Sequence, residues 1–275
     1  MTAEAASILQ HRIAECFSKA APHYDDHAGL QRDVADVLLN TLPADQALKR
    51  LVDVGCGTGY VTRGLRERYP DALMIGIDPA PGMLETAARR HGHDRLCWQL
   101  GDAEHLPFEC ASLDMMVSSL AIQWCPSPKG FLQEAERTLR PGGWLAFTTL
   151  LDGSLAELKT AFAALEDRPR INTFITAAAL SACLRASGLT ELSLTCANHR
   201  VFHDSAAESL RALKAVGAAT PDRPSRHGLM SRRHWTRMTR ALERFRTPEG
   251  LPTTYRVAFV VMRKPDGLSH DGSMT

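Results

Sequence analysis

Short apolar runs alternate with amphipathic stretches through the first half of the chain. From residue 28 to residue 42, apolar side chains recur at helical spacing and predict an amphipathic helix. Beyond it the pattern predicts strands at 51–54, 72–78, 95–102, 112–124 and 143–150, with helices at 60–69, 82–90 and 129–139. Strands that alternate with helices at this pace predict a parallel, doubly wound sheet.

Helical periodicity dominates the second half of the chain. Helices are predicted near 154–166, 176–187, 204–217 and 231–246. Two strand-like runs, 191–202 and 253–264, could pair antiparallel and extend one edge of the parallel sheet. The expected fold is therefore α/β, with a Rossmann-like, mostly parallel sheet and an antiparallel edge hairpin.

These patterns divide the chain into four parts. Residues 1–45 are expected to form a helical arm or lid, and residues 46–150 a Rossmann-like core. Residues 151–265 are expected to complete the core sheet and to carry helical cap insertions. The tail, 266–275, is polar and rich in turn formers, which predicts disorder.

The charge balance bears on possible partners. The 275 residues include 32 basic and 31 acidic side chains, so no global field favours nucleic acid or a membrane surface. One stretch is locally basic and suits either a solvated helical face or an acidic partner. It contains Arg211, Lys214, Arg223, Arg226, Arg232, Arg233, Arg237 and Arg240.

The seven cysteines are scattered and form no C-x-x-C pair, so neither a disulfide framework nor a zinc site is predicted. His91 and His93 are spaced H-x-H, but no carboxylate or thiol cluster joins them, and no metal site is expected. The N-terminus lacks the pattern of a signal peptide, and no apolar run approaches the roughly 20 residues of a membrane span. We expect a cytoplasmic protein.

The stretch LVDVGCGTGYV, residues 51–61, joins a predicted strand to a helix through a glycine-rich turn. Glycine permits positive φ and has no Cβ to keep a ligand from the backbone, so Gly55, Gly57 and Gly59 predict a nucleotide-binding corner. Cys56 is expected to contribute to this corner by packing. Asp53 precedes the turn, and its charge disfavours a pyrophosphate and favours a cationic ligand.

Two further acids follow predicted strands. Asp78, about twenty residues beyond the glycines, suits a ribose diol because a carboxylate can accept two hydroxyl hydrogen bonds. Asp102 ends the third predicted strand and suits the exocyclic amine of an adenine. Three acids at neighbouring strand ends fit S-adenosylmethionine, whose sulfonium and ammonium groups are both positive. A Rossmann-type domain that binds another nucleotide remains the alternative.

The acids, the glycines and the turn Pro141-Gly142-Gly143 together resemble the signature of class I S-adenosylmethionine-dependent methyltransferases. The resemblance covers roughly residues 45–150. It implies further contacts to the cofactor from Pro79, Met83, Gly101, Ala103 and Ser119.

Six segments between residues 17 and 262 resemble the malonyl-[acyl-carrier-protein] O-methyltransferase family of early biotin synthesis. They read FSKAAPHYDDHAGLQ, SSLAIQWC, LAFTTLLDGSLAEL, RINTF, SLRALKAVGA and GLPTTYRVAF. The resemblance implies methyl transfer to the free carboxylate of a malonyl thioester on acyl carrier protein. Because that carboxylate is ionised at neutral pH, no acid/base pair is expected. Arg170 is a departure, since the family often has a histidine there.

The resemblance also implies roles near the methyl group. Tyr24 would cover the methionine end of the cofactor as part of a lid, or it would clamp the arm to the core. Gln123 would donate hydrogen bonds to an acceptor oxygen. Trp124 would form a wall of the methyl-transfer site, unless it is an ordinary core residue.

Several residues are candidates to contact the acceptor. Those expected to hold the malonyl group are Arg170, Asn172, Tyr255 and Arg256, although the two arginines and the asparagine could instead be structural. Arg211 and Lys214 begin the basic stretch, which becomes a candidate docking face for acyl carrier protein, itself a small acidic protein.

Two other functions remain open at this point. A small-carboxylate methyltransferase of the trans-aconitate type shares the Gln-Trp pair after the fourth strand, but it would not account for LRALKAVGA and TTYRVAF. An assembly factor that binds S-adenosylmethionine without methylating malonyl thioesters is the other. An Arg-rich presequence would favour it, whereas this N-terminus carries Glu4 and lacks that bias.

Overall fold

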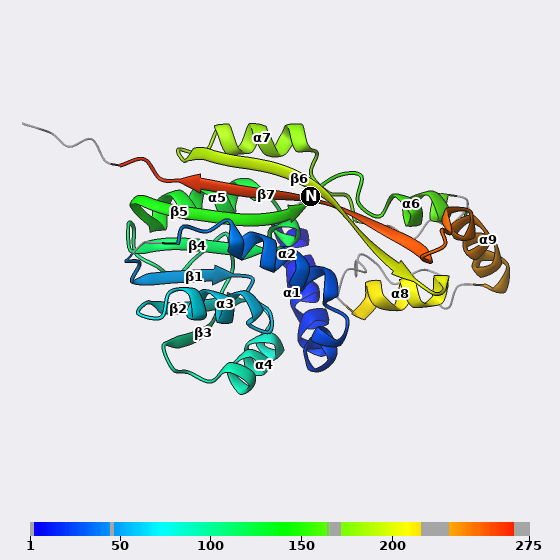
Figure 1. Cartoon of the computed structure of the whole chain (residues 1–275), viewed down its shortest axis with the longest axis horizontal. Coiled ribbons are helices and arrows are strands. Elements are labelled where there is room, and N and C mark those ends of the chain that lie inside the picture. The colour runs from blue at the N-terminus through cyan, green and yellow to red at the C-terminus, as the bar shows by residue number, and fades with distance from the viewer. Residues whose placement is uncertain (1–2, 45–46, 164, 166–171, 216–230, 267–275) are drawn as a thin grey trace, which may run out of the picture.

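The computed structural model describes residues 3–44, 47–163, 165, 172–215 and 231–266. Within them, five parallel strands continue into two antiparallel strands and form one seven-stranded sheet. In spatial order these strands are β3 (Leu96–Leu100), β2 (Leu73–Asp78), β1 (Arg50–Val54), β4 (Leu113–Ser119), β5 (Leu139–Leu150), β7 (Leu251–Arg263) and β6 (Thr190–His203) (Figure 1).

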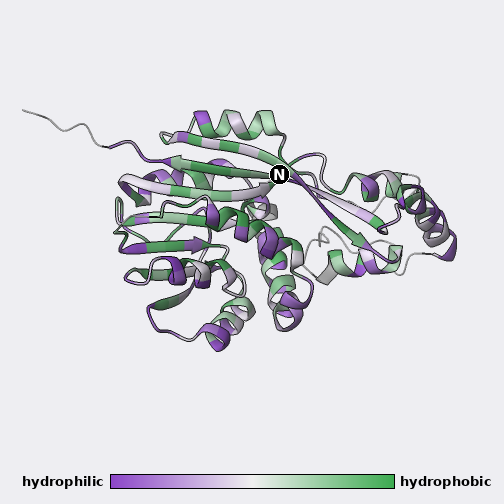
Figure 2. Ribbon diagram, in the orientation of Figure 1, coloured by the Kyte–Doolittle hydropathy of each residue, from purple (hydrophilic) through white to green (hydrophobic). Residues whose placement is uncertain are grey.

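Helices cover both faces of the sheet. On one face, Leu38 and Leu65 share a buried core with Met115. On the other, Phe131 and Leu180 share a core with strand residues of β4, β5 and β7. In Figure 2, green hydrophobic stretches run along the central strands, which agrees with these cores. The helices concerned are α2 (Gly29–Asn40) and α3 (Tyr60–Arg68) on the first face, and α5 (Pro128–Thr138) and α7 (Ala177–Arg185) on the second.

Hydroxyl side chains fix where several helices begin. Ser127, Thr176 and Ser231 each accept a hydrogen bond from a main-chain N–H in the first turn of α5, α7 and α9 (Arg232–Leu242), respectively. Such caps satisfy main-chain donors that have no partner within the helix.

The N-terminal arm packs against α4 (Pro81–His91) at one side of the sheet. It consists of α1 (Ala3–Ala20) and the short helix η1 (Ala21–Asp26). The contact has a small core of its own, formed by Ala14, Ala21, Ala80 and Met83. None of the described helices is both long and apolar enough to cross a membrane.

Strands β6 and β7 continue past the parallel strands as a two-stranded ribbon (Figure 1). The far end of this ribbon carries α6 (Ala156–Ala163), α8 (Ala206–Ala215), α9 and η3 (Glu243–Phe245). Leu158, Leu213, Met238 and Tyr255 belong to a separate buried core that holds these helices to the ribbon. The cap is therefore built on the edge strands of the same sheet.

The predicted α/β fold and its antiparallel edge hairpin are confirmed. Two boundaries are wrong. The fourth strand ends at Ser119 instead of Trp124, because Ile122–Trp124 forms a 3-10 turn, η2. Pro141-Gly142-Gly143 lies inside β5, because the N–H of Gly142 donates to the carbonyl of Lys264 and the N–H of Lys264 donates to Gly143.

Candidate active site

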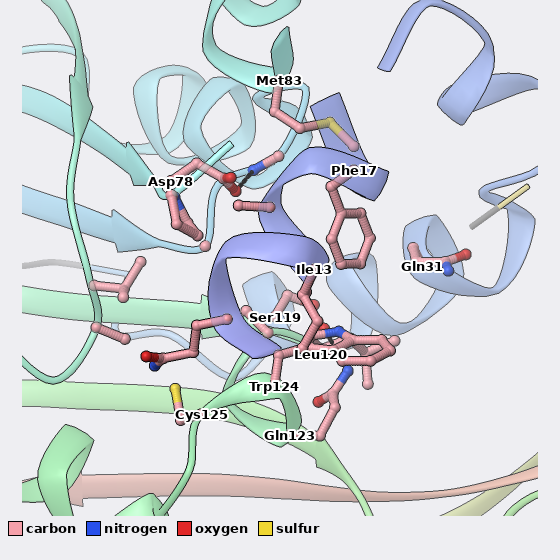
Figure 3. A pocket seen from close by; sticks show the side chains of 18 of the residues that line it. Ile13, Phe17, Gln31, Asp78, Met83, Ser119, Leu120, Gln123, Trp124 and Cys125 are labelled. Carbon is pink, nitrogen blue, oxygen red and sulfur yellow. Dashed lines mark hydrogen bonds between the residues drawn. The ribbon is translucent and has the colours of Figure 1, made fainter. Parts of the chain in front are cut away.

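A cavity of about 370 Å³ lies at the carboxyl ends of the parallel strands, beneath the N-terminal arm (Figure 3). β1 lies between β2 and β4, so the strand order reverses at this point. Open α/β sheets bind ligands at such a switch point. The described wall combines the arm, α2 and the glycine turn with the segments at the ends of β2, β3, β4 and β5.

The glycine turn is fastened to the end of β2. The N–H of Gly55 donates to the carbonyl of Ile77 at 2.7 Å, and the N–H of Gly57 donates to Asp78 Oδ2 at 2.9 Å. Gly55 has a φ of +73°, and a Cβ there would lie 2.2 Å from the Cβ of Ala121. Only glycine therefore lets the turn approach the segment after β4 this closely.

Asp78 lines the cavity and is 8% exposed. Its Oδ1 accepts a hydrogen bond from the N–H of Ala80 at 2.8 Å, while Oδ2 is held by Gly57. Burial raises the pKa of this carboxyl to about 6, although the two N–H donors act in the opposite direction. Each oxygen has a further lone pair, so the carboxylate can also accept hydrogen bonds from a ligand.

Asp53 is buried behind the turn and is not part of the cavity wall. Its Oδ2 accepts a hydrogen bond from the hydroxyl of Thr62 at 2.6 Å, and its Oδ1 has no hydrogen-bond partner among the described residues. Burial raises its pKa to about 7, and the charge of Asp78 adds to this. The expected contact between Asp53 and a cationic ligand stays a prediction.

The other cofactor candidates fall into two groups. Cys56 is buried below the turn, and Gly59 is the residue that precedes the first turn of α3. Asp102 lies in the wall, where its Oδ1 accepts a hydrogen bond from the N–H of Glu104 at 3.0 Å. The candidates that line the cavity are Gly55, Gly57, Asp78, Pro79, Met83, Gly101, Asp102, Ala103 and Ser119.

Aromatic rings from the arm and from η2 meet above the cavity. The ring of Phe17 lies edge-on to Trp124, with centroids 5.5 Å apart, and edge-on to Tyr24 at 6.3 Å. All three line the cavity, and Figure 3 shows α1 lying across it with Phe17 and Ile13 on the helix. Burial and the nearby charge of Asp78 raise the pKa of Tyr24 above its ordinary value, so its phenol remains a hydrogen-bond donor.

The segment after β4 is held in a strained conformation. Leu120 has a φ of +48°, which is costly for a residue with a branched side chain and occurs where surrounding contacts enforce it. Its N–H donates to Thr148 Oγ1 at 2.9 Å, and its carbonyl accepts from Gln123 Nε2 at 2.5 Å. These bonds orient the amide of Gln123 in the cavity wall and preorganise the turn that bears Trp124.

Tyr255 enters the wall from β7, close to the end of β5. Burial and the charge of Glu157 raise its pKa, so this phenol also stays protonated. Glu157 is itself fixed, since it accepts hydrogen bonds from the N–H of Thr254 at 3.1 Å and from its hydroxyl at 2.5 Å. The wall therefore holds two neutral phenol donors, one from the arm and one from β7.

Apart from Tyr255, the described residues expected to bind malonate or its carrier lie outside the cavity wall. Arg170 and the side chain of Lys214 fall outside the described residues. Asn172 is partly buried and Arg256 exposed, and neither is in the described wall of the cavity. Arg211 is exposed on α8, at the end of the ribbon. Their roles stay predictions.

Sequence reasoning missed part of the roof. Ile13 and Phe17 are four residues apart and face the cavity, so helical periodicity in the arm would have found them. Leu30 and Gln31, at the start of α2, also line it. No local signal marks Leu120, because its conformation depends on a hydrogen bond to β5.

The charges of the cavity wall fit a cationic ligand. Within its described part, Asp78 and Asp102 are acidic and no residue is lysine or arginine. Two carboxylates in a partly enclosed, largely apolar cavity attract positive charge. The wall thus fits S-adenosylmethionine, and the assignment of Asp78 to the ribose and of Asp102 to the adenine amine stays a prediction.

Comparison with known proteins gives the family. A family model described as "Methyltransferase domain" matches residues 52–147. Malonyl-[acyl-carrier protein] O-methyltransferase of Dechloromonas aromatica is 39% identical over 253 residues, which cover 92% of this chain and 94% of that protein. The enzyme of the same name from Hahella chejuensis is 35% identical over 263 residues, which cover 94% of this chain and 92% of that protein. This chain belongs to the malonyl-[acyl-carrier protein] O-methyltransferase family.

As a member of this O-methyltransferase family, the chain is an enzyme that uses S-adenosylmethionine as its cofactor. A second kind of relative is longer. The biotin biosynthesis bifunctional protein BioHC of Cellvibrio japonicus is 38% identical over 261 residues, and the chain spans 51% of that protein. The predicted class I signature is confirmed at the level of family and cofactor.

Solved structures confirm the fold of this O-methyltransferase. The YcgJ protein of Bacillus subtilis has a TM-score of 0.60 at 18% identity and covers 86% of this chain and 99% of its own. The [4+2]-cyclase SpnF has a TM-score of 0.55 at 20% identity, with 86% and 81% covered. Because a cyclase shares this fold, the fold alone does not give the acceptor.

The raised pKa of Asp78 predicts how cofactor affinity depends on pH. A ligand that donates hydrogen bonds to the ionised carboxylate binds more weakly once pH falls below the pKa of about 6. S-adenosylhomocysteine should bind about ten-fold more weakly at pH 5 than at pH 8, and calorimetric titration can measure this. In Asp78→Asn, affinity at pH 8 should fall about ten-fold and the loss below pH 6 should vanish. An unchanged pH profile in Asp78→Asn would contradict the ribose assignment.

Proposed function

We propose that this enzyme methylates the free carboxylate of a malonyl thioester on acyl carrier protein, giving the malonyl methyl ester for pimeloyl and biotin biosynthesis. The observation that carries the proposal is the 39% identity to a malonyl-[acyl-carrier protein] O-methyltransferase over nearly the full length of both chains. The chemistry of the cavity wall adds support. All seven cysteines are free thiols, which agrees with a reducing, cytoplasmic location.

The acceptor needs little activation. A carboxylic acid has a pKa near 4, so the malonyl carboxylate arrives ionised at neutral pH. S-adenosylmethionine, when bound, supplies the methyl group, and its sulfur keeps the electron pair of the bond that breaks. The wall provides no competing thiolate, since burial raises the pKa of Cys125 to about 12. Catalysis then rests on placing two reactants in line, an effect worth roughly 7–11 kcal/mol.

Neutral hydrogen-bond donors orient the reacting carboxylate with less loss of nucleophilicity than a cation would cause. A bidentate arginine on the reacting carboxylate would stabilise its charge and lower its nucleophilicity. Tyr24, Tyr255 and Gln123 instead offer O–H and N–H groups, and the raised pKa values of both phenols keep them protonated. We assign them to orient the carboxylate and the thioester carbonyl, with Trp124 excluding water.

Methyl transfer removes the positive charge on the cofactor sulfur, and this change favours release of the product. The cofactor is cationic at sulfur before transfer and neutral at sulfur afterwards, whereas Asp78 and Asp102 remain in the wall. The electrostatic attraction between the cavity and the cofactor is therefore greater before the reaction than after it. This difference favours exchange of the product for a new cofactor.

The carrier protein is proposed to dock at the cap. α9 contains Arg232, Arg233, Arg237 and Arg240 but no Asp or Glu, and these arginines are exposed. Trp235, on the same helix, is 37% exposed and adds an apolar contact. Arg211 on α8 lies at the same end of the ribbon (Figure 1). A basic face of this kind complements an acidic carrier protein and steers its approach; Arg223 and Arg226 lie outside the described residues.

The activity can be tested directly with methyl-labelled S-adenosylmethionine and malonyl-acyl carrier protein. The label should appear on the carrier as a methyl ester that mild base removes, with a mass gain of one methylene. Trans-aconitate serves as the competing acceptor, and Asp78→Ala as the variant with impaired cofactor binding. Preferred methylation of trans-aconitate, or cofactor binding without any methyl transfer to the carrier, would overturn the proposal.

Charge reversal tests the docking face. Arg233→Glu combined with Arg240→Glu should raise KM for malonyl-acyl carrier protein about ten-fold or more and leave KM for malonyl-coenzyme A nearly unchanged, because only the carrier presents an acidic surface. The matched control is Arg185→Glu on α7, a helix that lies far from α9 (Figure 1), where Arg185 donates a hydrogen bond to Ser181 Oγ at 2.7 Å. Equal losses on both substrates, or equal effects of the control, would remove α9 as the docking face.

A further inference from the structure

Asp25 joins the N-terminal arm to the glycine turn and to α4. Its Oδ1 accepts a hydrogen bond from the hydroxyl of Thr58, which lies between Gly57 and Gly59 in the turn, at 2.7 Å. Its Oδ2 forms an ion pair with Arg90 at the carboxyl end of α4. Its main-chain carbonyl accepts from Arg32 of α2 at 2.6 Å. A single residue of η1 thus contacts three parts of the cofactor-binding core.

The turn is held from both sides at Thr58. Its hydroxyl donates to Asp25, while its carbonyl contacts His91 Nε2 at 3.1 Å. Arg90 and His91 are consecutive residues at the end of α4. The last turn of α4 therefore contacts the glycine turn through His91 and the arm through Arg90. Asp25 contacts both Thr58 and Arg90, so the arm, the turn and α4 are joined to one another at this residue.

The rest of the contact between the arm and α4 is small. Its buried core consists of three alanines and Met83, with Phe17 and Tyr24 packed against it. At the other end of α4, the N–H of Gly82 donates to Ser18 Oγ at 3.2 Å. A Cβ on Gly82 would lie 2.6 Å from the carbonyl oxygen of Ser18, so α1 sits tightly on the helix start. Alanine side chains bury little apolar area, so directional contacts have a large share in orienting the arm.

Tyr24 immediately precedes Asp25 and lines the cavity. The contacts that hold Asp25 in place therefore also restrict the position of the Tyr24 side chain. The arm also roofs part of the cavity, so movement of the arm away from the core widens the path by which a bound cofactor leaves. Breaking the contacts of Asp25 is part of that movement.

We propose that Asp25 is a positioning residue that latches the N-terminal arm onto the glycine turn, and that its contacts with Thr58 and Arg90 set how fast the cofactor is released. The latch acts through Tyr24 and the arm and does not touch the reacting atoms. The proposal depends on binding of the family's cofactor, S-adenosylmethionine, and is independent of which acceptor is methylated.

The ion pair between Asp25 and Arg90 is partly accessible, since both side chains are 34% exposed. Such a pair is weakened by dissolved salt. The bond from Thr58, which is 4% exposed, is sheltered and charge-assisted. Release of the cofactor should therefore accelerate with ionic strength in the native enzyme and lose most of that dependence when Asp25 is neutral.

Stopped-flow fluorescence of the full chain can measure the dissociation rate of S-adenosylhomocysteine without any acceptor. Asp25→Ala should dissociate about ten-fold faster than the native enzyme, and Asp25→Asn, which can still accept from Thr58, by a smaller factor. Arg90→Gln and Thr58→Val break the same contacts from the other side and should each accelerate release. Combining Asp25→Ala with Arg90→Gln should add little to the effect of Asp25→Ala alone.

The control is Asp26→Ala. Asp26 is the neighbouring acid, is exposed, and contacts His23 Nδ1 at 3.4 Å, so its loss should leave the dissociation rate unchanged. A merely structural role for Asp25 would lower the melting temperature without changing this rate relative to the control, and that result would overturn the latch. Should Asp25→Ala not fold, Arg90→Gln decides, since unchanged release in that variant contradicts the proposal equally. Because no acceptor is present, the outcome is independent of whether malonyl-acyl carrier protein is methylated.

Discussion

The buried carboxylate of Asp78 is the interaction on which the rest of the site depends. It sits at the tip of β2, accepts one N–H from Gly57 and one from Ala80, and lines the cavity with its remaining lone pairs. Burying a charged group is costly unless donors compensate. The glycine turn supplies one of those donors, so the same bond stabilises the acid and fixes the turn.

The parallel part of the sheet and the antiparallel ribbon that carries the cap form different parts of the site. The parallel strands bring the cofactor contacts to one edge, whereas the antiparallel extension of β6 and β7 carries the cap helices past it. Tyr255 and Glu157 link the two, since Tyr255 lines the cavity and Glu157 binds the preceding Thr254. The ribbon that carries the cap thus takes part in the cavity wall, and because solved structures of this fold include a [4+2]-cyclase, the fold alone does not fix the acceptor.

The sequence predicts the contacts that follow from short-range pattern and topology. Gly57 and Asp78 could be paired in advance, because glycine marks the turn and parallel strands bring their carboxyl ends to one edge. The antiparallel pair β6 and β7 was likewise accessible from two strand-like runs. Leu120 was not, because its left-handed conformation depends on a bond to Thr148 of β5. The contact between the arm and η2 was not either, since Phe17 meets Trp124 only once α1 has folded over the sheet.

The most direct measurement is a crystal structure of the full chain with S-adenosylhomocysteine. The ribose hydroxyls should lie within hydrogen-bond distance of the Asp78 carboxylate, with the adenine beside Asp102. The sulfur should lie beneath Tyr24, facing Gln123 and Trp124. A ligand bound outside the cavity under the arm, or one whose ribose makes no contact with Asp78, would contradict the account.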